Sequence, residues 1–341
     1  MITTYFRSSS LGTYKMCNLK YFLNYVLGHQ EPANAKANWG TTVHAVFETL
    51  AICKKRIQTG ERKRMKITQD PIGEFSFSKE ELYTDEFVYK ILNKSFEFYK
   101  KHCPDTIFDS KSYDFCEKMV WDTLRYNNGQ FDPRNRTIID TEPHFDFAID
   151  EPWAKFSFDG PDGKIEGNLA VKGTIDLITE LPDRTIEVID WKTGKRIDWA
   201  TGEEKDYNKL MKDTQLLLYY YAIGRLYPKY EHRLMTIFFC RSGGPFTLAY
   251  DEDDVAGFMD HLKKTFQEIS NNQNPKPRSR DRSDFRCTKL CHYYKNNWPG
   301  TDQTMCHYTE SQLHTIGMNE TVKQLSRPGF VIGTYKDPGA V

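Results

Sequence analysis

Apolar residues recur at helical spacing in the first segment of the chain and again in its C-terminal half. In residues 8–27 they follow one another every three or four positions, as Leu11, Tyr14, Cys17, Tyr21 and Tyr25. This spacing predicts a helix that Gly28 ends. Similar patterns predict further helices over 41–54, 79–130, 213–226 and 251–270.

Near residue 140 the helical pattern gives way to β-branched runs separated by turn residues. These runs predict strands over 144–149, 171–181, 185–191 and 235–240. The predicted elements follow the order helices, strands, and then a strand with a helix. This order is typical of a sheet covered by helices. We therefore expect an α/β fold, with a core sheet flanked by helices and a helical N-terminal elaboration.

Two aspartates are placed to pair across a predicted hairpin. Residues 181–185, Leu-Pro-Asp-Arg-Thr, form a turn by composition. A turn centred on Asp183 sets Asp176 directly opposite Asp190, with Cβ atoms roughly 5 Å apart. Because side chains alternate along a strand, Asp190 and Lys192 share one face.

Like charges at such a distance repel, so a protein keeps the pair where a cation lies between them. Carboxylates suit Mg²⁺ or Mn²⁺, which activate water and stabilise charge on a phosphate. A lysine one step beyond is placed to orient the water or neutralise the phosphate. The alternative is that Asp176, Asp190 and Lys192 are ordinary exposed charges at strand ends.

Asp176, the triplet Asp190–Lys192, and Gln215 with Tyr219 on a following helix resemble the PD-(D/E)XK nuclease superfamily, in its RecB-like branch. The resemblance implies a restriction-endonuclease-like mixed sheet. It also implies that the two acids bind metal and that Lys192, Gln215 and Tyr219 are catalytic. Gln215 and Tyr219 are four residues apart and so share a helix face, although helix packing alone could explain that pair.

The same branch has a histidine early in the chain, on a helix after a small-residue turn. The segment Gly40–His44 matches this feature, which implies that His44 is a third metal ligand. A lone helical histidine is otherwise a structural residue. Glu48, one turn on, is a candidate to orient His44, and Glu142 is a candidate to approach the site.

Eight cysteines in an intracellular chain favour buried residues or metal ligands over disulfides. Cys17 with Cys287, Cys291 and Cys306 resembles the iron–sulfur exonucleases, namely AddB-type nuclease domains and CRISPR-associated spacer-acquisition exonucleases. There, four thiolates hold a [4Fe–4S] cluster that staples the two chain ends. Cys287 and Cys291 are more widely spaced than is usual in that family, and His292 and His307 adjoin cysteines, so a Zn²⁺ site stays open. The remaining cysteines read as buried small residues: Cys53, Cys103, Cys116 and Cys240.

We expect one elaborated nuclease domain followed by a tail. The predicted divisions are 1–310 for the domain (1–30 plus 271–310 the iron–sulfur staple, 41–135 the helical region, 140–270 the catalytic core) and 311–341 for the C-terminal tail.

Charge does not point to nucleic acid globally, because 47 basic and 47 acidic residues balance. Locally, residues 54–66 and 276–295 are basic, and the second segment and its C-terminal neighbour Trp298 interleave aromatic residues. Each is a candidate surface for phosphates or a single strand, or else a solvated loop.

The N-terminus has no apolar stretch of signal-peptide length, and the run 216–224 is too short to span a bilayer. We expect a cytoplasmic protein without a membrane partner. The function implied is a metal-dependent DNA nuclease that acts as an exonuclease on ends or single strands, with DNA repair, recombination, CRISPR adaptation and viral DNA processing all open as its pathway. The alternatives are a nuclease-like binding module that does not cleave, and a nuclease subunit dependent on a helicase or recombination protein. The sequence has no motor-type phosphate-binding loop, so a helicase would be a separate chain.

Overall fold

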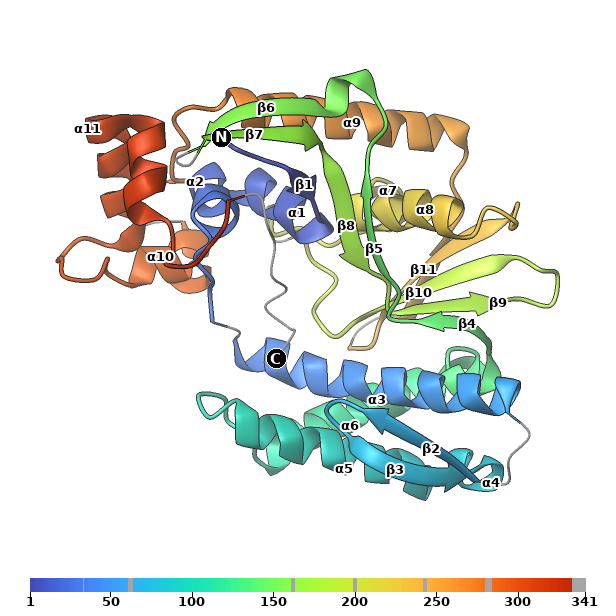
Figure 1. The fold of residues 1–341 in the computed structure, drawn as a ribbon. Coiled ribbons are helices and arrows are strands. Elements are labelled where there is room, and N and C mark those ends of the chain that lie inside the picture. Colours follow the sequence, from blue (N-terminus) through green and yellow to red (C-terminus); the bar gives the residue numbers. More distant parts are fainter. Residues whose placement is uncertain are drawn as a thin grey trace.

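The structure is a computed structural model. It describes residues 1–32, 34–60, 64–160, 163–198, 201–241, 244–279 and 284–332. A central sheet lies between two helical layers (Figure 1). No helix in these ranges is long and apolar enough to cross a membrane.

The central sheet has five strands in the order β12-β11-β10-β9-β4. Their bounds are Thr137–Thr141 for β4, Leu177–Glu180 for β9, Ile186–Lys192 for β10, Arg233–Phe239 for β11 and Gly244–Leu248 for β12. β10 and β11 are parallel, and the other neighbours are antiparallel. The sheet is therefore mixed, as the family resemblance implied.

A second sheet continues from the first through a bent hairpin. It has the order β1-β8-β5, with bounds Tyr5–Phe6, Ala170–Thr174 and His144–Ala148. The predicted single strand 171–181 was wrong, because it breaks at residues 175–176 into β8 and β9. Glu142, with a φ of +49°, stands opposite this break, and its N–H donates to the Asp176 carbonyl at 3.2 Å. Such a break re-aims the side chains beside it.

Strand β10 separates the two parts of the core. Ile186 and Val188 face one cluster of buried residues, whereas Ile189 and Trp191 face the other. A central strand buried on both faces reads as continuously apolar, and this one departs from that pattern at the buried acids Glu187 and Asp190. Asp190 lies on the same face as Ile186 and Val188.

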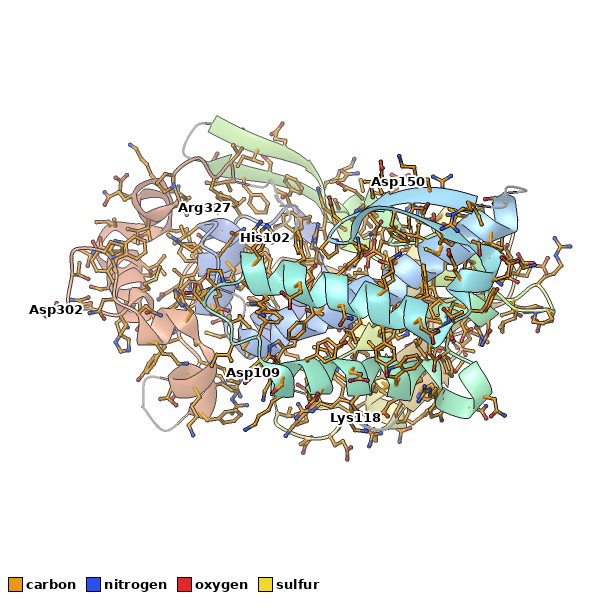
Figure 2. All side chains as sticks on the ribbon, turned by 90° about the horizontal axis from the view of Figure 1, so that it is seen from below. His102, Asp109, Lys118, Asp150, Asp302 and Arg327 are labelled. Carbon is orange, nitrogen blue, oxygen red and sulfur yellow. The ribbon has the colours of Figure 1, made fainter. Side chains whose placement is uncertain are left out.

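Helices α7, α8 and α9 lie on the Val188 side of the sheet, with bounds Tyr207–Met211, Thr214–Leu226 and Glu252–Asn271. The long helix α3, Ala35–Thr59, crosses the other side. Helices α5, Asp85–His102, and α6, Ser110–Leu124, cover α3 from outside (Figure 2). The helical predictions for 213–226 and 251–270 are confirmed within a few residues at each end, whereas the region predicted to be helical over 79–130 is divided into separate helices, among them α5 and α6.

The helical region also contains a β-hairpin that the sequence did not predict. Strands β2, Arg64–Gln69, and β3, Gly73–Ser78, pair antiparallel before the short helix α4, Lys79–Leu82. The loop expected over 54–66 was wrong in its described part, because α3 continues to Thr59 and β2 begins at Arg64. Residues 61–63 of that segment lie outside the described ranges.

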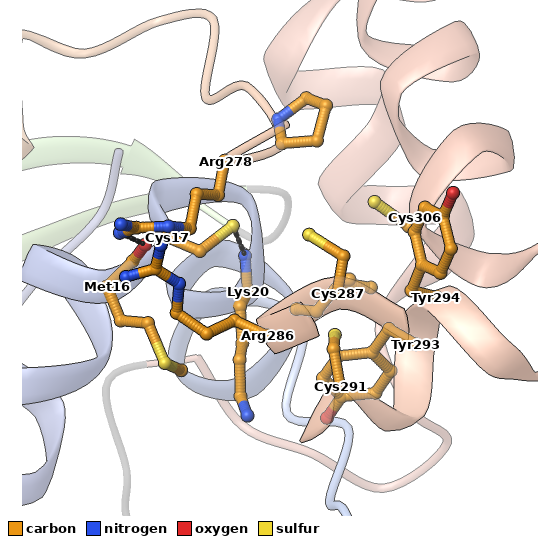
Figure 3. A pocket seen from close by; sticks show the side chains of 12 residues that line it. Met16, Cys17, Lys20, Arg278, Arg286, Cys287, Cys291, Tyr293, Tyr294 and Cys306 are labelled. Atoms are coloured by element: carbon orange, nitrogen blue, oxygen red, sulfur yellow. Dashed lines mark hydrogen bonds between the residues drawn. The ribbon is translucent and has the colours of Figure 1, made fainter. Parts of the chain in front are cut away.

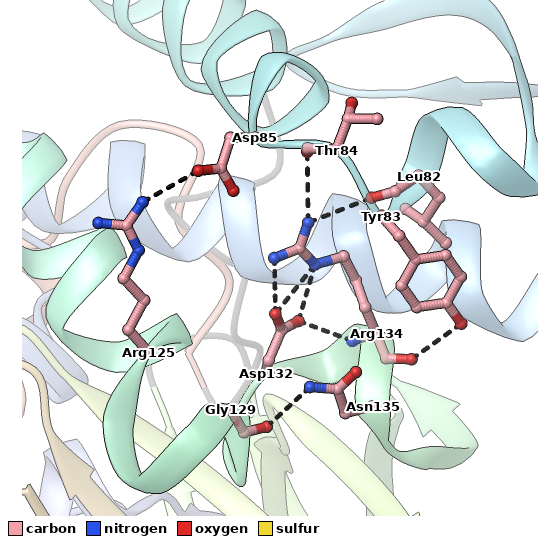
Figure 4. A network of polar contacts seen from close by, with 9 residues as sticks. All are labelled: Leu82, Tyr83, Thr84, Asp85, Arg125, Gly129, Asp132, Arg134 and Asn135. Atoms are coloured by element: carbon pink, nitrogen blue, oxygen red, sulfur yellow. Dashed lines mark hydrogen bonds and ion pairs between the residues drawn. The ribbon is translucent and has the colours of Figure 1, made fainter.

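A buried ion pair joins the helical region to the connection that enters β4. Arg134, in the 3₁₀ turn η3 (Pro133–Asn135), binds Asp132 through several hydrogen bonds of 2.7–3.0 Å and also donates to the carbonyls of Leu82 and Thr84 (Figure 4). Both charged side chains are at most 8% exposed. The Arg125–Asp85 pair drawn beside it is more than half exposed. Only the first pair is sheltered enough from water to matter strongly for stability.

Both ends of the chain meet beside the sheet. The predicted helix over 8–27 is interrupted, because Cys17 has an extended backbone (φ −164°). It divides into α1, Ser8–Met16, then α2, Asn18–Tyr21, and the π-helical turn η1, Phe22–Val26. The C-terminal elements η5, Arg286–Leu290, α10, His292–Lys295, and α11, Met305–Leu325, pack against this segment.

Helix α11 continues well past residue 310, where we expected a loosely held tail to begin. Leu313, Val322 and Leu325 of this helix are buried in the main core cluster. Residues 333–341 of the expected tail lie outside the described ranges. A further hairpin that was not predicted, β6 (Lys155–Gly160) with β7 (Gly163–Asn168), and the short turns η2 (Tyr126–Gly129) and η4 (Pro152–Ala154) complete the fold.

Candidate active site and cysteine pocket

The predicted hairpin register is the observed one. Ile186 pairs with Glu180 and Ile189 with Leu177, so the next positions beyond the ladder are Asp190 and Asp176. Asp176 lies in the break before β9 rather than within a strand. One of its oxygens, Oδ2, accepts a hydrogen bond of 2.9 Å from the N–H of Trp191. This bond holds the Asp176 side chain against β10.

Lys192 lies against Asp190, two residues earlier on the same face of β10. Its Nζ is 2.9 Å from Oδ1 and 2.7 Å from Oδ2 of the carboxylate. The Asp190 side chain is buried, whereas about a third of the Lys192 side chain is exposed. The charge of the buried Asp190 is thus balanced by a lysine whose side chain is partly exposed at the surface.

Helix α8 supplies the amide and the phenol. Asp213 accepts a hydrogen bond from the N–H of Gln215 and so caps the start of α8. The Gln215 Nε2 donates to Asp190 Oδ1 at 3.2 Å and lies 2.7 Å from the Tyr219 hydroxyl, which itself donates to the Thr174 carbonyl at 2.7 Å. The two α8 residues are therefore linked to β10 and to the end of β8 at once.

Helix α3 brings a histidine to the same place from the other side. Nδ1 of His44 lies 3.5 Å from Oδ2 of Asp176. The approach of α3 to β10 depends on Gly40, one turn earlier, because a Cβ there would lie only 2.4 Å from Oγ1 of Thr193. The helix predicted over 41–54 begins earlier, at Ala35, so Gly40 lies inside α3.

Burial and neighbouring charges shift the protonation equilibria of these groups. Burial raises the pKa of Asp190; the Lys192 charge opposes this shift, and Asp176 adds to it. For Lys192, burial favours the neutral amine, but Asp190 and Asp176 outweigh it and raise the pKa. Burial lowers the pKa of His44 against the opposing effect of Asp176, which favours the neutral imidazole that ligates metals.

Two further acids lie near the site. Glu48 accepts a hydrogen bond of 2.5 Å from Gln69 of β2, and burial raises its pKa to about 7, with the Asp176 charge adding to the shift. The bond to Gln69 ties Glu48 to the β2–β3 hairpin, a partner that the sequence did not suggest. Glu142 is joined by its backbone to Asp176, opposite the break in the bent hairpin.

The donor set fits a hard divalent cation. Two carboxylates suit Mg²⁺ or Mn²⁺, with the neutral imidazole as a third ligand, and the only partner that the described residues give the buried Oδ2 of Asp190 is the Lys192 ammonium at 2.7 Å. Over those same residues, however, no three His, Cys, Asp or Glu side chains are already grouped as a metal cage. Lys192 lies against the carboxylate of Asp190, so metal binding would require its ammonium to shift.

The four cysteines singled out in the sequence line one pocket, although they come from both ends of the chain. Cys17 lies at the break after α1, Cys287 in η5, Cys291 before α10, and Cys306 at the start of α11 (Figure 3). All four are free thiols. Burial raises the pKa of Cys291 to about 11, and it also raises those of Cys287 and Cys306.

Cations next to the thiols would oppose this effect, because they favour the thiolate that binds metal. Lys20, Arg278 and Arg286 line the pocket with the cysteines. Neither His292 nor His307 is in its described lining. The other four cysteines, Cys53, Cys103, Cys116 and Cys240, lie elsewhere; all but the half-buried Cys103 are buried.

Five of the ten described lysines and arginines in the two basic segments pair with acids. In the first, three cations pair with acids at 2.6–3.1 Å, as Lys55–Asp140, Arg64–Glu81 and Lys66–Glu74. In the second, Arg278 and Arg286 both bind Asp284. Arg62, Lys63, Arg280 and Arg282 lie outside the described residues.

The aromatic residues of the second segment are mostly structural. Tyr293 is buried and donates a hydrogen bond to Asn24. Trp298 stacks on Tyr308 and meets His29 edge-on. These contacts leave little of either ring for stacking on a base.

A mixed sheet that presents two acids and a lysine at the end of neighbouring strands is the arrangement expected of a nuclease core. A family model described as the PD-(D/E)XK nuclease superfamily matches residues 8–295. The chain therefore belongs to the PD-(D/E)XK nuclease superfamily, and the predicted restriction-endonuclease-like α/β fold is confirmed.

Other comparisons add little to this family match. No curated protein matches the chain. The fold is similar to a crystal structure from Eubacterium rectale named "Putative exonuclease", with 11% sequence identity and a TM-score of 0.45 over 87% of this chain and 88% of that chain.

Proposed function

We propose that this member of the superfamily is a metal-dependent DNA nuclease that hydrolyses phosphodiesters, acting as an exonuclease on ends or single strands. The observation that carries the proposal is the meeting of Asp176, Asp190, Lys192 and His44 at one end of β10. These residues come from a strand, a strand break and a helix. The arrangement leaves Lys192 partly exposed beside two acids, where a phosphate can reach it.

Asp176, Asp190 and His44 would hold Mg²⁺ or Mn²⁺. When bound, the ion would supply an activated water and stabilise negative charge on the phosphate. Asp190 already has the Lys192 ammonium as a partner, and the ion would further offset the cost of keeping a buried carboxylate charged near a second one. His44, whose pKa is lowered, would contribute a neutral nitrogen.

Lys192 would position the attacking water and stabilise the charge that develops on the scissile phosphate. Gln215 holds the Asp190 carboxylate through the 3.2 Å hydrogen bond and orients it. Tyr219 in turn holds Gln215 and is anchored on Thr174. Gln215 and Tyr219 would therefore keep the Asp190 carboxylate in a fixed position beside Lys192.

Digestion of end-labelled single- and double-stranded DNA with Mg²⁺, Mn²⁺ or EDTA tests the proposal. We expect metal-dependent release of label from linear DNA and no cutting of circular DNA, with Lys192→Ala as the inactive control. Cutting of circles would show an endonuclease. Binding without cleavage by the intact protein would favour the non-cleaving module, and cleavage only with an added helicase would favour the dependent subunit.

We propose further that Cys17, Cys287, Cys291 and Cys306 hold a [4Fe–4S] cluster that staples the chain ends. Its support is the shared pocket and the cations that line it. Four soft thiolates suit a cluster, and a link between Cys17 and Cys306 would close a very long loop.

Protein purified without oxygen should then be brown, with iron and sulfide in stoichiometric amounts. Colourless protein carrying one zinc per chain would assign the pocket to Zn²⁺ instead. Colourless protein without either metal would refute a metal site there.

A further inference from the structure

A second pocket lies beside the candidate active site, between α1 and the start of α8. One side of α1 forms one wall, and the segment from Lys205 to Gln215 forms the other. Gln215 belongs both to this pocket and to the group around Asp190, to which it donates its 3.2 Å hydrogen bond. A molecule bound in the pocket would therefore lie next to the reacting groups.

Lysines outnumber acidic residues in the lining of the pocket. Four lysines line it, namely Lys15, Lys205, Lys209 and Lys212, against two aspartates, Asp198 and Asp213. Lys205 pairs with Asp213, and Lys209 binds Glu203 at 2.7 Å. These two lysines are held in place by their partners.

The other two lysines are available to a ligand. The Lys15 side chain is 69% exposed, and its Nζ lies 3.6 Å from Oδ2 of Asp198. An exposed pair at this distance is weak. Lys212 is exposed and forms no ion pair within the described part of the chain.

Hydroxyl groups complete the lining. Ser8, Ser9 and Thr13 of α1 lie on the side of that helix that faces the lysines. Ammonium and hydroxyl donors together are the groups by which proteins hold phosphate oxygens. They carry no information about the bases, so binding here would be independent of sequence.

We propose that this lysine pocket, defined by Lys15, Lys205, Lys209, Lys212 and the α1 hydroxyls, binds the phosphate backbone of single-stranded DNA next to the phosphate that is cleaved. The proposal rests on the proposed nuclease function. A pocket walled by one nine-residue helix, about 13 Å long, fits one strand, and a positively charged groove is the usual path of single strands across proteins.

The test compares Lys15→Gln/Lys212→Gln with Lys101→Gln/Lys111→Gln, which removes two exposed lysines from α5 and α6 on the opposite side of α3. Binding of a fluorescent single-stranded oligonucleotide is measured in EDTA at several salt concentrations, and gels check that the probe stays intact. Each lost phosphate contact should lower the salt slope by about 0.7. We expect the pocket variant to bind roughly tenfold more weakly with a slope lower by about 1.4, and the control variant to bind like the unchanged protein.

Equal affinity and salt slope in both variants would overturn the proposal. The outcome is separable from that of the proposed function. Lysine-dependent binding by a protein that never cleaves would leave the pocket standing and refute the nuclease. Normal binding and cleavage by the pocket variant would refute the pocket and leave the proposed nuclease function standing.

Discussion

Gly40 is the position where the smallest change should disturb the candidate active site most. An added Cβ would lie 2.4 Å from Oγ1 of Thr193 and 3.4 Å from its Cβ. Thr193 follows Lys192 directly, and His44 lies one turn after Gly40. Gly40→Ala therefore requires α3 to move away from β10, or Thr193 to be displaced beside Lys192.

Two opposing contributions decide the stability of Gly40→Ala. Alanine favours a helix interior over glycine by about 1 kcal/mol, whereas overpacking costs about 1–3 kcal/mol. The free energy of unfolding should thus fall by no more than about 2 kcal/mol. Cleavage should suffer more, because a misplacement of about 1 Å can cost about a hundredfold in rate.

The assay combines thermal unfolding with digestion of end-labelled DNA for three variants. Gly257→Ala is the matched control, since Gly257 lies inside α9 with nothing within 4 Å of an added Cβ. It should be slightly more stable and equally active. Gly40→Ala/Thr193→Ala should regain activity, because the clashing hydroxyl is gone. If Gly40→Ala cleaved DNA as fast as Gly257→Ala, the close approach of α3 to β10 would not be what positions the site.

Three further sets of substitutions have distinct expected outcomes. Lys192→Ala should keep metal binding but cleave about a hundredfold or more slowly, which corresponds to about 3 kcal/mol. Asp190→Ala should in addition weaken Mn²⁺ binding, as measured by calorimetry. Near-normal cleavage by a folded Lys192→Ala protein would refute the role of the lysine. Cys306→Ser should lower the iron content and the melting temperature of anaerobically purified protein, and unchanged iron would exclude Cys306 as a ligand. Asp132→Ala should lower the free energy of unfolding in urea by about 3–5 kcal/mol, because it leaves a buried guanidinium unpaired. The exposed Asp85→Ala should leave this free energy almost unchanged. Equal losses would show that burial does not set the strength of the ion pair.

The register of the β9–β10 hairpin could be determined from the sequence because its causes are local. The turn at residues 181–185 is fixed by composition, and alternation along β10 then places Asp190 and Lys192 on one face. The observed pairing of Ile186 with Glu180 is the register that such a turn requires. The helical spacing of Gln215 and Tyr219 is local in the same way.

The sequence did not predict the β2–β3 and β6–β7 hairpins, because their local residue patterns carry little information about strand formation. Along β6, half-buried positions alternate with exposed ones, and neither β6 nor β7 has a fully buried residue. Strand β2 alternates exposed basic and polar residues with only two buried ones, Met65 and Ile67. Strands of this kind are defined by the partner they pair with rather than by their own residues.

What only the tertiary structure decided involves residues far apart in the chain. Sequence spacing cannot show that α3 approaches β10 at Gly40 and brings His44 to within 3.5 Å of Asp176, since this depends on how a helix packs on a sheet. The cysteine residues were linked by resemblance, but their shared pocket forms because the two chain ends pack together beside the sheet. The break at residues 175–176 turns one predicted strand into two and sets Asp176 against the backbone of β10. The sequence thus determines which side chains can carry the chemistry, and long-range packing determines which of them meet.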